Sequence, residues 1–250
     1  MLRTVLAPNP SPMTLQGTQT YVIGSREFAV VDPGSAAATH LDALAALSDE
    51  GVCVAVIVTH DHPDHIGGAR ELADRVGAPL LRFGDGLADG TKIDTDGGEL
   101  EALHTPGHTE DHVSLWWAAE RALFCGDLMM GGLDTALVAP PEGNLGDYLA
   151  SLQRIADLEP VIIYPAHGPA FTHPLPAIER YRKHRFEREE QVLNGLSEPA
   201  NEDQLTDRVY GNTIEPALRP YARSAIEAYL QHLEKNGRVK RGRMGWEKTL

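Results

Sequence analysis

The sequence is poor in cysteine, in positive charge and in long apolar runs. Only Cys53 and Cys125 occur among 250 residues, which excludes a disulfide framework and fits a reducing compartment. No segment approaches the roughly 18 apolar residues that a membrane-crossing helix needs. Residues 1–12 have neither the apolar core nor the cleavage site of a signal peptide. We therefore expect a cytoplasmic protein that makes no membrane contact.

Basic residues are outnumbered, with 22 Lys and Arg against 36 Asp and Glu and a formal net charge of −14. This balance excludes a protein that binds nucleic acid or an anionic membrane over its whole surface. The charge is unevenly spread, because residues 231–250 carry a net +4 and the remainder therefore carries −18. The C-terminal tip thus differs electrostatically from the body of the chain.

Short apolar strands and helical segments alternate through residues 1–165. The patterns predict strands at residues 21–24, 28–32, 52–58, 79–83, 99–104, 113–117, 122–125 and 161–164. They predict helices at residues 35–50, 66–76 and 145–158. Strands and helices mixed in this way favour an α/β fold with two sheets in the middle and helices outside them.

The C-terminal part has a different pattern. Residues 177–196 form a long, highly charged helical segment that ends at a break in residues 197–201. Two helices and a basic hairpin follow, at residues 203–210, 216–236 and 237–250. These elements predict a small winged-helix-like unit. We therefore divide the chain into a larger domain at residues 1–175 and a linking helix with a winged-helix-like domain at residues 176–250.

A cluster of histidines and carboxylates directly follows the apolar run 52–58. Residues 60–65 read His-Asp-His-Pro-Asp-His, and these side chains suit zinc and neighbouring first-row metals. One metal cannot take all of these ligands at this spacing without backbone strain, so the cluster favours two metals that share one loop. The alternative is a polar turn with solvated histidines. This interpretation is the weaker one, because the cluster lies at the end of a predicted strand.

Three further candidate ligands follow predicted strands. His108 lies in a Pro-Gly turn, Asp127 follows Gly126, and His167 precedes Gly168. A glycine beside a ligand lets the backbone approach a crowded metal centre. Each signal is weak alone, because a lone histidine or turn carboxylate is commonly an ordinary surface residue. Together and in this order they indicate one metal site.

These motifs resemble those of the metallo-β-lactamase superfamily over residues 15–170. The resemblance implies a four-layer αββα sandwich with two zinc ions per chain at one edge. Asp127 would bridge the two ions. The ligands implied for the first ion are His60, His62 and His108, and those for the second are Asp64, His65 and His167. Residues 9–21 and 105–112 are similar to the β-lactamase-like protein 2 subgroup, whose winged-helix-like tail extends the resemblance over nearly the whole chain.

The resemblance implies hydrolysis by a metal-bridging hydroxide. Two zinc ions about 3.5–4 Å apart can lower the pKa of a shared water toward ~7. Asp64 would be the catalytic group that orients the hydroxide and passes its proton to the leaving group. Candidate donors to the substrate oxygen are His112, Tyr164 and the backbone amides near residues 17–18. For His112, a role in supporting a ligand is an equal alternative.

Residue identities narrow the branch of the superfamily. Redox di-iron relatives carry Glu where this chain has His62, and true β-lactamases lack the bridging Asp127. Nucleases with a large inserted domain need more than the 39 residues that separate Asp127 from His167. Glyoxalase II-like thioester hydrolysis shares the ligands, but its glutathione contacts have no identified counterpart in this sequence. We therefore expect a small-molecule substrate with an ester, thioester, lactone or amide bond.

The main alternative is a single-strand endoribonuclease of the β-lactamase-like protein 2 type. The basic tip would then contact RNA phosphates, and Trp246 or Tyr229 would stack on bases. The acidic body favours instead a solvated basic hairpin with Trp246 packed against its own helix. A regulatory winged-helix protein with a vestigial metal site is a third possibility, disfavoured because no ligand is missing. Specificity is expected in the loops at residues 13–20, 84–92 and 129–146.

Overall fold

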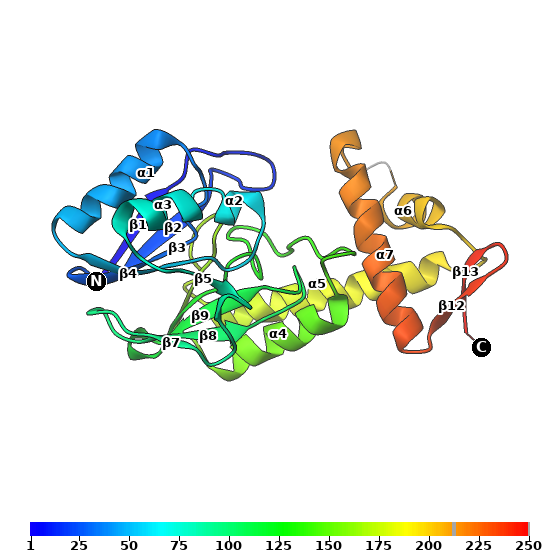
Figure 1. Ribbon diagram of the computed structural model, residues 1–250. Helices are drawn as coiled ribbons and strands as arrows, with labels where there is room; N and C mark the ends of the chain where they lie inside the picture. The colour runs from blue at the N-terminus through cyan, green and yellow to red at the C-terminus, as the bar shows by residue number, and fades with distance from the viewer. Residues whose placement is uncertain (212–213, 250) are drawn as a thin grey trace.

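Two β-sheets form the middle of the larger domain, and helices lie outside both of them (Figure 1). The computed structural model describes residues 1–211 and 214–249. The first sheet has the strand order β1 (Leu2–Leu6), β2 (Gln19–Ile23), β3 (Glu27–Val31), β4 (Val52–Ile57), β5 (Leu80–Phe83) and β6 (Gly86–Leu87). The second has the order β11 (Ile162–Tyr164), β10 (Ala122–Phe124), β9 (Val113–Trp117), β8 (Leu100–His104) and β7 (Lys92–Ile93).

Helices cover the outer face of each sheet, which confirms the predicted αββα sandwich. α1 and α3 lie on the first sheet, whereas α4 and α5 lie on the second (Figure 1). The helices up to residue 195 are α1 (Ala38–Ala45), α2 (Pro63–Ile66), α3 (Ala69–Val76), α4 (Leu145–Asp157) and the linking helix α5 (Pro174–Gly195). Short 3-10 helices occupy Ala46–Asp49, Ala118–Glu120 and Pro216–Leu218.

Three apolar clusters separate the layers. In β4, Val56 points outward and packs with Leu41 and Leu72 of the helices, whereas Ile57 points inward against the second sheet. This alternation is the two-residue period of a strand. The third cluster begins on the outer face of the second sheet and continues through α4 and α5 to α7 (Arg219–Lys235). The winged-helix-like unit therefore shares a hydrophobic core with the larger domain.

Most predicted elements are confirmed, with shifts of a few residues at their bounds. The helix predicted at residues 66–76 is divided into α2 and α3 at Gly67 and Gly68. A Cβ at Gly67 would lie 2.5 Å from the Pro63 carbonyl oxygen, so this turn approaches neighbouring backbone more closely than a side chain allows. The strands β1, β6 and β7 were not predicted.

The predicted winged-helix-like unit is present at the C-terminal end (Figure 1). It consists of α6 (Glu202–Tyr210), α7, β12 (Val239–Gly242) and β13 (Gly245–Lys248). A capping box formed by Asn201 and Gln204 begins α6. The last residue of the predicted hairpin, Leu250, lies outside the described residues. Within the described ranges, no helix is both long and apolar enough to cross a membrane.

Candidate metal centre

The predicted ligands lie where strands end at one edge of the sandwich. Residues 60–65 follow β4, His108 lies between β8 and β9, Asp127 follows β10, and His167 follows β11. The structure gathers them into two groups, and within each group the candidate ligand atoms lie within 4.8 Å of one another. The first group is His60, His62 and His108, and the second is Asp64, His65, Asp127 and His167. All seven predicted ligands are thus brought together.

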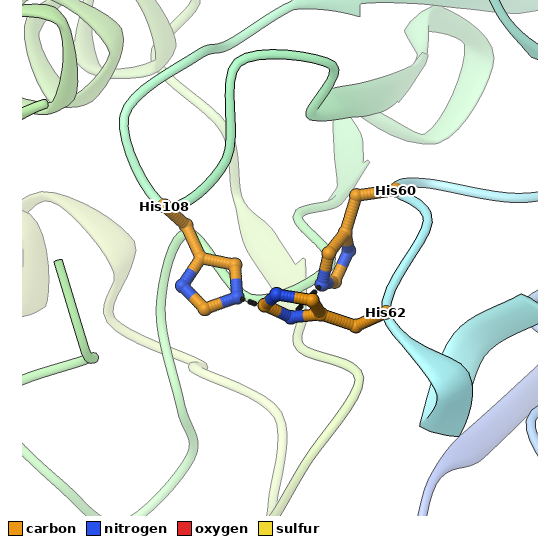
Figure 2. Close-up of side chains that lie close together, drawn as sticks. All are labelled: His60, His62 and His108. Atoms are coloured by element: carbon orange, nitrogen blue, oxygen red, sulfur yellow. Dashed lines mark hydrogen bonds between the residues drawn. The ribbon is translucent and has the colours of Figure 1, made fainter. Parts of the chain in front are cut away.

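The first group presents three imidazole nitrogens to one point (Figure 2). His62 Nδ1 lies 2.9 Å from His60 Nε2 and 3.1 Å from His108 Nε2. Three neutral imidazoles in this arrangement would crowd their lone pairs together unless a cation or shared proton lay among them. The geometry is that of a three-histidine metal position.

The second group mixes imidazoles with carboxylates. His167 Nε2 lies 3.2 Å from Asp64 Oδ2 and 3.3 Å from Asp127 Oδ1. His65 Nε2 lies 3.5 Å from the same Asp127 oxygen. The other oxygen of this carboxylate, Oδ2, lies 3.6 Å from His108 Nε2 of the first group. Asp127 therefore stands between the two groups with one oxygen toward each, as a bridging carboxylate would.

The polar atoms of the second group fit a bound cation. His65 Nε2, Asp127 Oδ1 and His167 Nε2 are buried and have no hydrogen-bond partner within residues 1–211 and 214–249. Buried polar atoms are nearly always paired, because an unpaired one loses its hydration without compensation. Nitrogen and carboxylate oxygen are also the donor types that bind zinc and related metals. A metal ion at this position would satisfy all three atoms.

Outer partners orient the imidazoles toward this point. His65 Nδ1 lies 2.9 Å from the buried Asp32 Oδ2, and His62 Nε2 lies 2.9 Å from Glu142 Oε2. His108 Nδ1 lies 2.7 Å from a backbone carbonyl oxygen, and His167 Nδ1 lies 3.3 Å from another. Each of these contacts places the ring proton on the outer nitrogen and leaves the inner nitrogen free for a metal.

Asp32 and Glu142 were not singled out from the sequence as functional residues. Asp32 is only the last residue of the strand predicted at residues 28–32. The available signal was its position at the end of β3, because β3 is parallel to β4 and the two strands end at the same edge. Glu142 has no comparable signal, because it lies in an irregular loop far from residues 60–65 in the chain.

The two groups differ in protonation. Burial and the neighbouring imidazoles lower the pKa of His60 well below its usual value and keep the ring neutral. For His65, burial lowers the pKa, but the carboxylates of Asp32 and Asp127 outweigh it and raise the pKa well above its usual value. Burial also lowers the pKa of His167, but the Asp64 carboxylate outweighs it, and the pKa lies above its usual value. The second group therefore binds protons that an incoming metal ion would displace.

His112 and Tyr164 were predicted as contacts to the substrate, with support of a ligand as the alternative for His112, and neither residue lines the cavity at the metal centre. His112 is fully buried; its Nε2 accepts a hydrogen bond from the Asp127 backbone N–H at 3.2 Å, and its Nδ1 lies 3.0 Å from Thr105 Oγ1. Burial lowers the pKa of His112 to about 3, so the neutral ring holds the Asp127 backbone in place. Tyr164 stacks on Phe124 between the sheets, at 5.3 Å between ring centroids. Neither side chain reaches the open side of the centre.

The backbone amides near residues 17–18 are also engaged elsewhere. The Thr18 N–H donates to Asn9 Oδ1 at 2.9 Å, and the Gly17 N–H donates to a carbonyl oxygen of its own turn at 2.9 Å. They are therefore not free donors for a substrate. Instead, the Thr18 hydroxyl donates to the Asp64 backbone carbonyl at 2.8 Å. Residues 17–18 thus support the ligand loop rather than donate to the substrate.

A cavity of about 260 Å³ opens onto the candidate ligands. Its polar lining is His62, Asp64, His108 and Asp127. Its other lining residues are Met13, Met130, Ala136, Leu137 and Tyr221. The predicted specificity loops 13–20 and 129–146 thus reach the centre, whereas residues 84–92 include β6 and the start of β7.

Tyr221 lines the cavity at the metal centre, although the sequence analysis did not identify it as a site residue. It lies near the start of α7, in the winged-helix-like unit, and it also lines a neighbouring cavity beside His62 and His108. Its side chain is 45% exposed, so no apolar pattern distinguishes it from an ordinary surface tyrosine. Only the packing of α7 against the larger domain brings it to the site.

An αββα sandwich with a seven-residue His/Asp centre at one edge is the arrangement of a metal-dependent hydrolase. Comparison with known proteins gives the family. Residues 13–92 and 85–167 match the Metallo-beta-lactamase superfamily, and residues 202–246 match the Beta-lactamase associated winged helix domain. The chain belongs to the metallo-β-lactamase superfamily, as the sequence motifs predicted.

Individual relatives agree with this assignment. A Beta-lactamase-like protein 2 homolog of Caenorhabditis elegans is 34% identical, over 94% of this chain and 84% of the relative. An Atrochrysone carboxyl ACP thioesterase of Aspergillus chevalieri is 32% identical, over 92% of this chain and 78% of the relative. The crystal structure of a Beta-lactamase domain protein from Burkholderia ambifaria has a TM-score of 0.85 at 19% identity, covering 99% of this chain and 91% of that one. The last comparison shows the fold alone.

Proposed function

We propose that this chain is a binuclear zinc hydrolase that cleaves an ester, thioester, lactone or amide bond of a small substrate. Among these substrates, an acyl thioester is the class that we consider first. The proposal of zinc is supported by the donor set, in which histidine nitrogens and carboxylate oxygens converge on two positions. When bound, such ions acidify a water molecule and polarise a carbonyl oxygen.

The chain's own residues would orient the reactants and move the proton. The Asp64 side chain is 28% exposed, lines the cavity, and has one oxygen 3.2 Å from His167 Nε2. We infer that this carboxylate orients the attacking water and passes its proton to the leaving group. Tyr221 lines the same cavity and offers a hydroxyl donor to the substrate carbonyl oxygen.

The observation that carries this proposal is a second, apolar cavity that adjoins the first. It has a volume of about 290 Å³ and lies between α5, α7 and the loop after β10. Five of its lining residues also line the cavity at the metal centre: Met13, Met130, Ala136, Leu137 and Tyr221. An acyl group attached to the scissile carbonyl would bury its apolar surface there, at a gain of about 25 cal/mol per Å². The cavity lies between the two domains that we propose at residues 1–175 and 176–250.

The charge around the metal centre disfavours a polyanionic substrate such as RNA. A cavity beside His62 is bordered by four carboxylates, which we call the acidic rim: Asp61, Glu110, Asp111 and Glu142. Affinity for RNA depends on cations that neutralise phosphates, and carboxylates at the entrance oppose the approach of the backbone. A small neutral or locally apolar substrate avoids this repulsion.

The basic tip is poorly suited to bind RNA. Arg238, Lys240 and Arg241 each lie within 3.3 Å of a carboxylate of this chain. Trp246 and Tyr229, the residues considered for base stacking, are buried at 4% and 2% exposure, and Trp246 Nε1 donates to Glu202. Buried rings offer no face to an unpaired base. The structure therefore favours the packed hairpin over the stacking platform.

The named activity of one group of relatives points the same way. The relative from Aspergillus chevalieri and another from Passalora fulva are both named Atrochrysone carboxyl ACP thioesterase, and each is 32% identical to this chain. Each match spans more than 90% of this chain, far more than the ligand motifs alone. This similarity supports a thioester as the first substrate class to test.

A substrate panel tests the proposal. Zinc-loaded protein is assayed with acyl thioesters, lactones, a chromogenic β-lactam and unstructured RNA. We expect acyl hydrolysis, and we expect Asp64→Ala to lower kcat/KM by roughly 10²–10⁴-fold because it removes the proton-transfer group. Asp42→Ala, at an exposed carboxylate paired with Arg75, is the control. RNA cleavage that Asp64→Ala abolishes, without turnover of any acyl substrate, would overturn the proposal in favour of the endoribonuclease.

The acidic rim gives a prediction about the leaving group. For one acyl group, we expect the neutral N-acetylcysteamine thioester to have a kcat/KM roughly 10-fold above that of the anionic coenzyme A thioester. The difference should shrink with added salt and in Glu110→Gln, because both weaken the repulsion. Glu99→Gln, at an exposed carboxylate paired with Lys92, should leave it unchanged. A preference for the coenzyme A thioester at low salt would contradict this role of the acidic rim.

A further inference from the structure

The apolar cavity has a basic region, which we call the basic end, where α5 forms its wall. Among its lining residues that do not line the metal-centre cavity are His184, Arg185 and Arg188, all on α5. The walls between these residues and the metal centre are mostly methionine, leucine and alanine side chains. A ligand that extends from the metal-centre cavity into the apolar cavity therefore contacts apolar side chains that line both cavities, and it can reach the positive charge of α5.

Two polar atoms at the basic end lack partners. His184 Nδ1 and Arg185 Nε are buried and have no hydrogen-bond partner in the part of the chain that the structure describes. Arg185 is fixed in place, because its Nη2 donates to the Ala136 carbonyl oxygen at 2.5 Å and its guanidinium lies over the Tyr148 ring. Such atoms are costly to bury unless a ligand or water pairs with them. The basic end thus has unused hydrogen-bonding capacity.

Arg188 supplies a second positive charge that is half-buried. Its guanidinium lies 4.1 Å from the centroid of the Tyr210 ring, and it forms no ion pair among the residues described. Burial, together with Arg185 and Arg188, lowers the pKa of His184 to about 4, so the imidazole is neutral near pH 7. The charge at this end is therefore that of two arginines, which suits an anionic oxygen.

We propose that the basic end binds the far end of the substrate's acyl group, and that the preferred acyl group has a carboxylate or another anionic oxygen there. This inference rests on the proposed acyl hydrolysis. It fits the acidic rim, because a substrate that is neutral at its leaving group and anionic at its acyl end can enter in only one favourable orientation. The metal centre would then face the bond between these two ends.

Equilibrium binding tests the inference separately from turnover. Calorimetry compares suberate with octanoate on the zinc-loaded protein, because both offer one carboxylate to the metals and only suberate offers a second one to the basic end. We expect suberate to bind about 10- to 100-fold more tightly than octanoate. This is the gain in affinity that a hydrogen bond to a charged group usually gives. Arg188→Met should reduce this preference to what Arg185 alone supplies, and Arg188→Lys should restore part of the difference.

The control is Arg182→Met, which removes a cation of the same helix that bonds Gln153 outside the cavity. It should keep the preference for suberate. The same comparison in turnover uses the monosuberyl and octanoyl thioesters of N-acetylcysteamine, for which Arg188→Met should raise the KM of the suberyl substrate more than it lowers kcat. Equal binding of the two acids, or a preference that Arg188→Met leaves unchanged, would overturn the inference. A preference that depends on Arg188, without hydrolysis of any ester, thioester, lactone or amide, would retain the site and refute the proposed function.

Discussion

Asp127→Asn is expected to abolish tight metal binding at both positions and hydrolysis with it. The Asp127 carboxylate turns Oδ1 toward His65 and His167 and Oδ2 toward His108, so each candidate metal position depends on one of its oxygens. An amide has one neutral oxygen and an NH₂ group that cannot serve as a ligand, so one position loses a ligand and the other loses the negative charge that attracts the ion. The loss should exceed the roughly 10–100-fold in affinity that removal of an outer partner costs.

Metal content and thermal stability measure this effect. We expect two zinc ions per wild-type chain after gel filtration and fewer than one per Asp127→Asn chain. The wild-type protein should also gain Tm on zinc addition, because a ligand at about 1,000 times its Kd stabilises by ~4.1 kcal/mol. Asp134→Asn is the control, since this exposed carboxylate pairs with Arg180 in a nearby loop. Two tightly bound ions in Asp127→Asn would refute the bridging role.

The ligands were accessible to sequence reasoning because their signals are local. Each of the later ligands follows a short apolar strand and adjoins a glycine that the structure requires. At Gly126, φ is +49°, and a Cβ would lie 2.6 Å from His112 Nε2 and 2.8 Å from Thr59 Oγ1. A glycine next to a candidate ligand in the sequence therefore indicates a crowded centre. The strands themselves were predictable because burial on both faces gives continuous apolar runs.

The contacts to the substrate were harder to predict, because side-chain direction or tertiary packing decides which residues line the cavity. Tyr164 is the last residue of β11, whereas Asp127 lies in the turn after β10. Ile163 faces the outer cluster, and so Tyr164 faces the layer between the sheets. The two-residue period of the strand contained that information. The position of Tyr221 beside His62 depends instead on how α7 packs against the larger domain, and no local pattern encodes that contact.

Asp32 is the outer partner whose removal should have the largest effect. Its Oδ1 accepts the Thr59 backbone N–H at 2.8 Å, and its Oδ2 accepts the Thr59 hydroxyl at 2.8 Å and lies 2.9 Å from His65 Nδ1. The residue has φ of +48°, a left-handed conformation in which Asp and Asn are enriched among non-glycine residues. The carboxylate thus fixes both the ring orientation of His65 and the strand end that begins the ligand loop.

Asp32→Asn keeps the volume and the backbone preference but replaces one acceptor oxygen with a donor. We expect the affinity for one of the two zinc ions to fall by about 10–100-fold, because His65 loses the carboxylate that holds its proton on Nδ1. The other ion, at His60, His62 and His108, should be retained, so the metal content should fall from two toward one. The loss of a charged hydrogen bond should also lower the free energy of unfolding by about 1.5–3 kcal/mol.

The selectivity of this loss distinguishes an orienting role from a purely structural one. A merely destabilised fold would weaken both metal positions together, whereas a displaced His65 ring weakens only the second group. Competition titrations of both zinc equivalents, with Tm measured on the same samples, separate the two cases. Asp42→Asn, at the exposed carboxylate of α1 that pairs with Arg75, should change neither quantity. Equal weakening of both equivalents in Asp32→Asn would mean that Asp32 supports the strand end rather than the ligand.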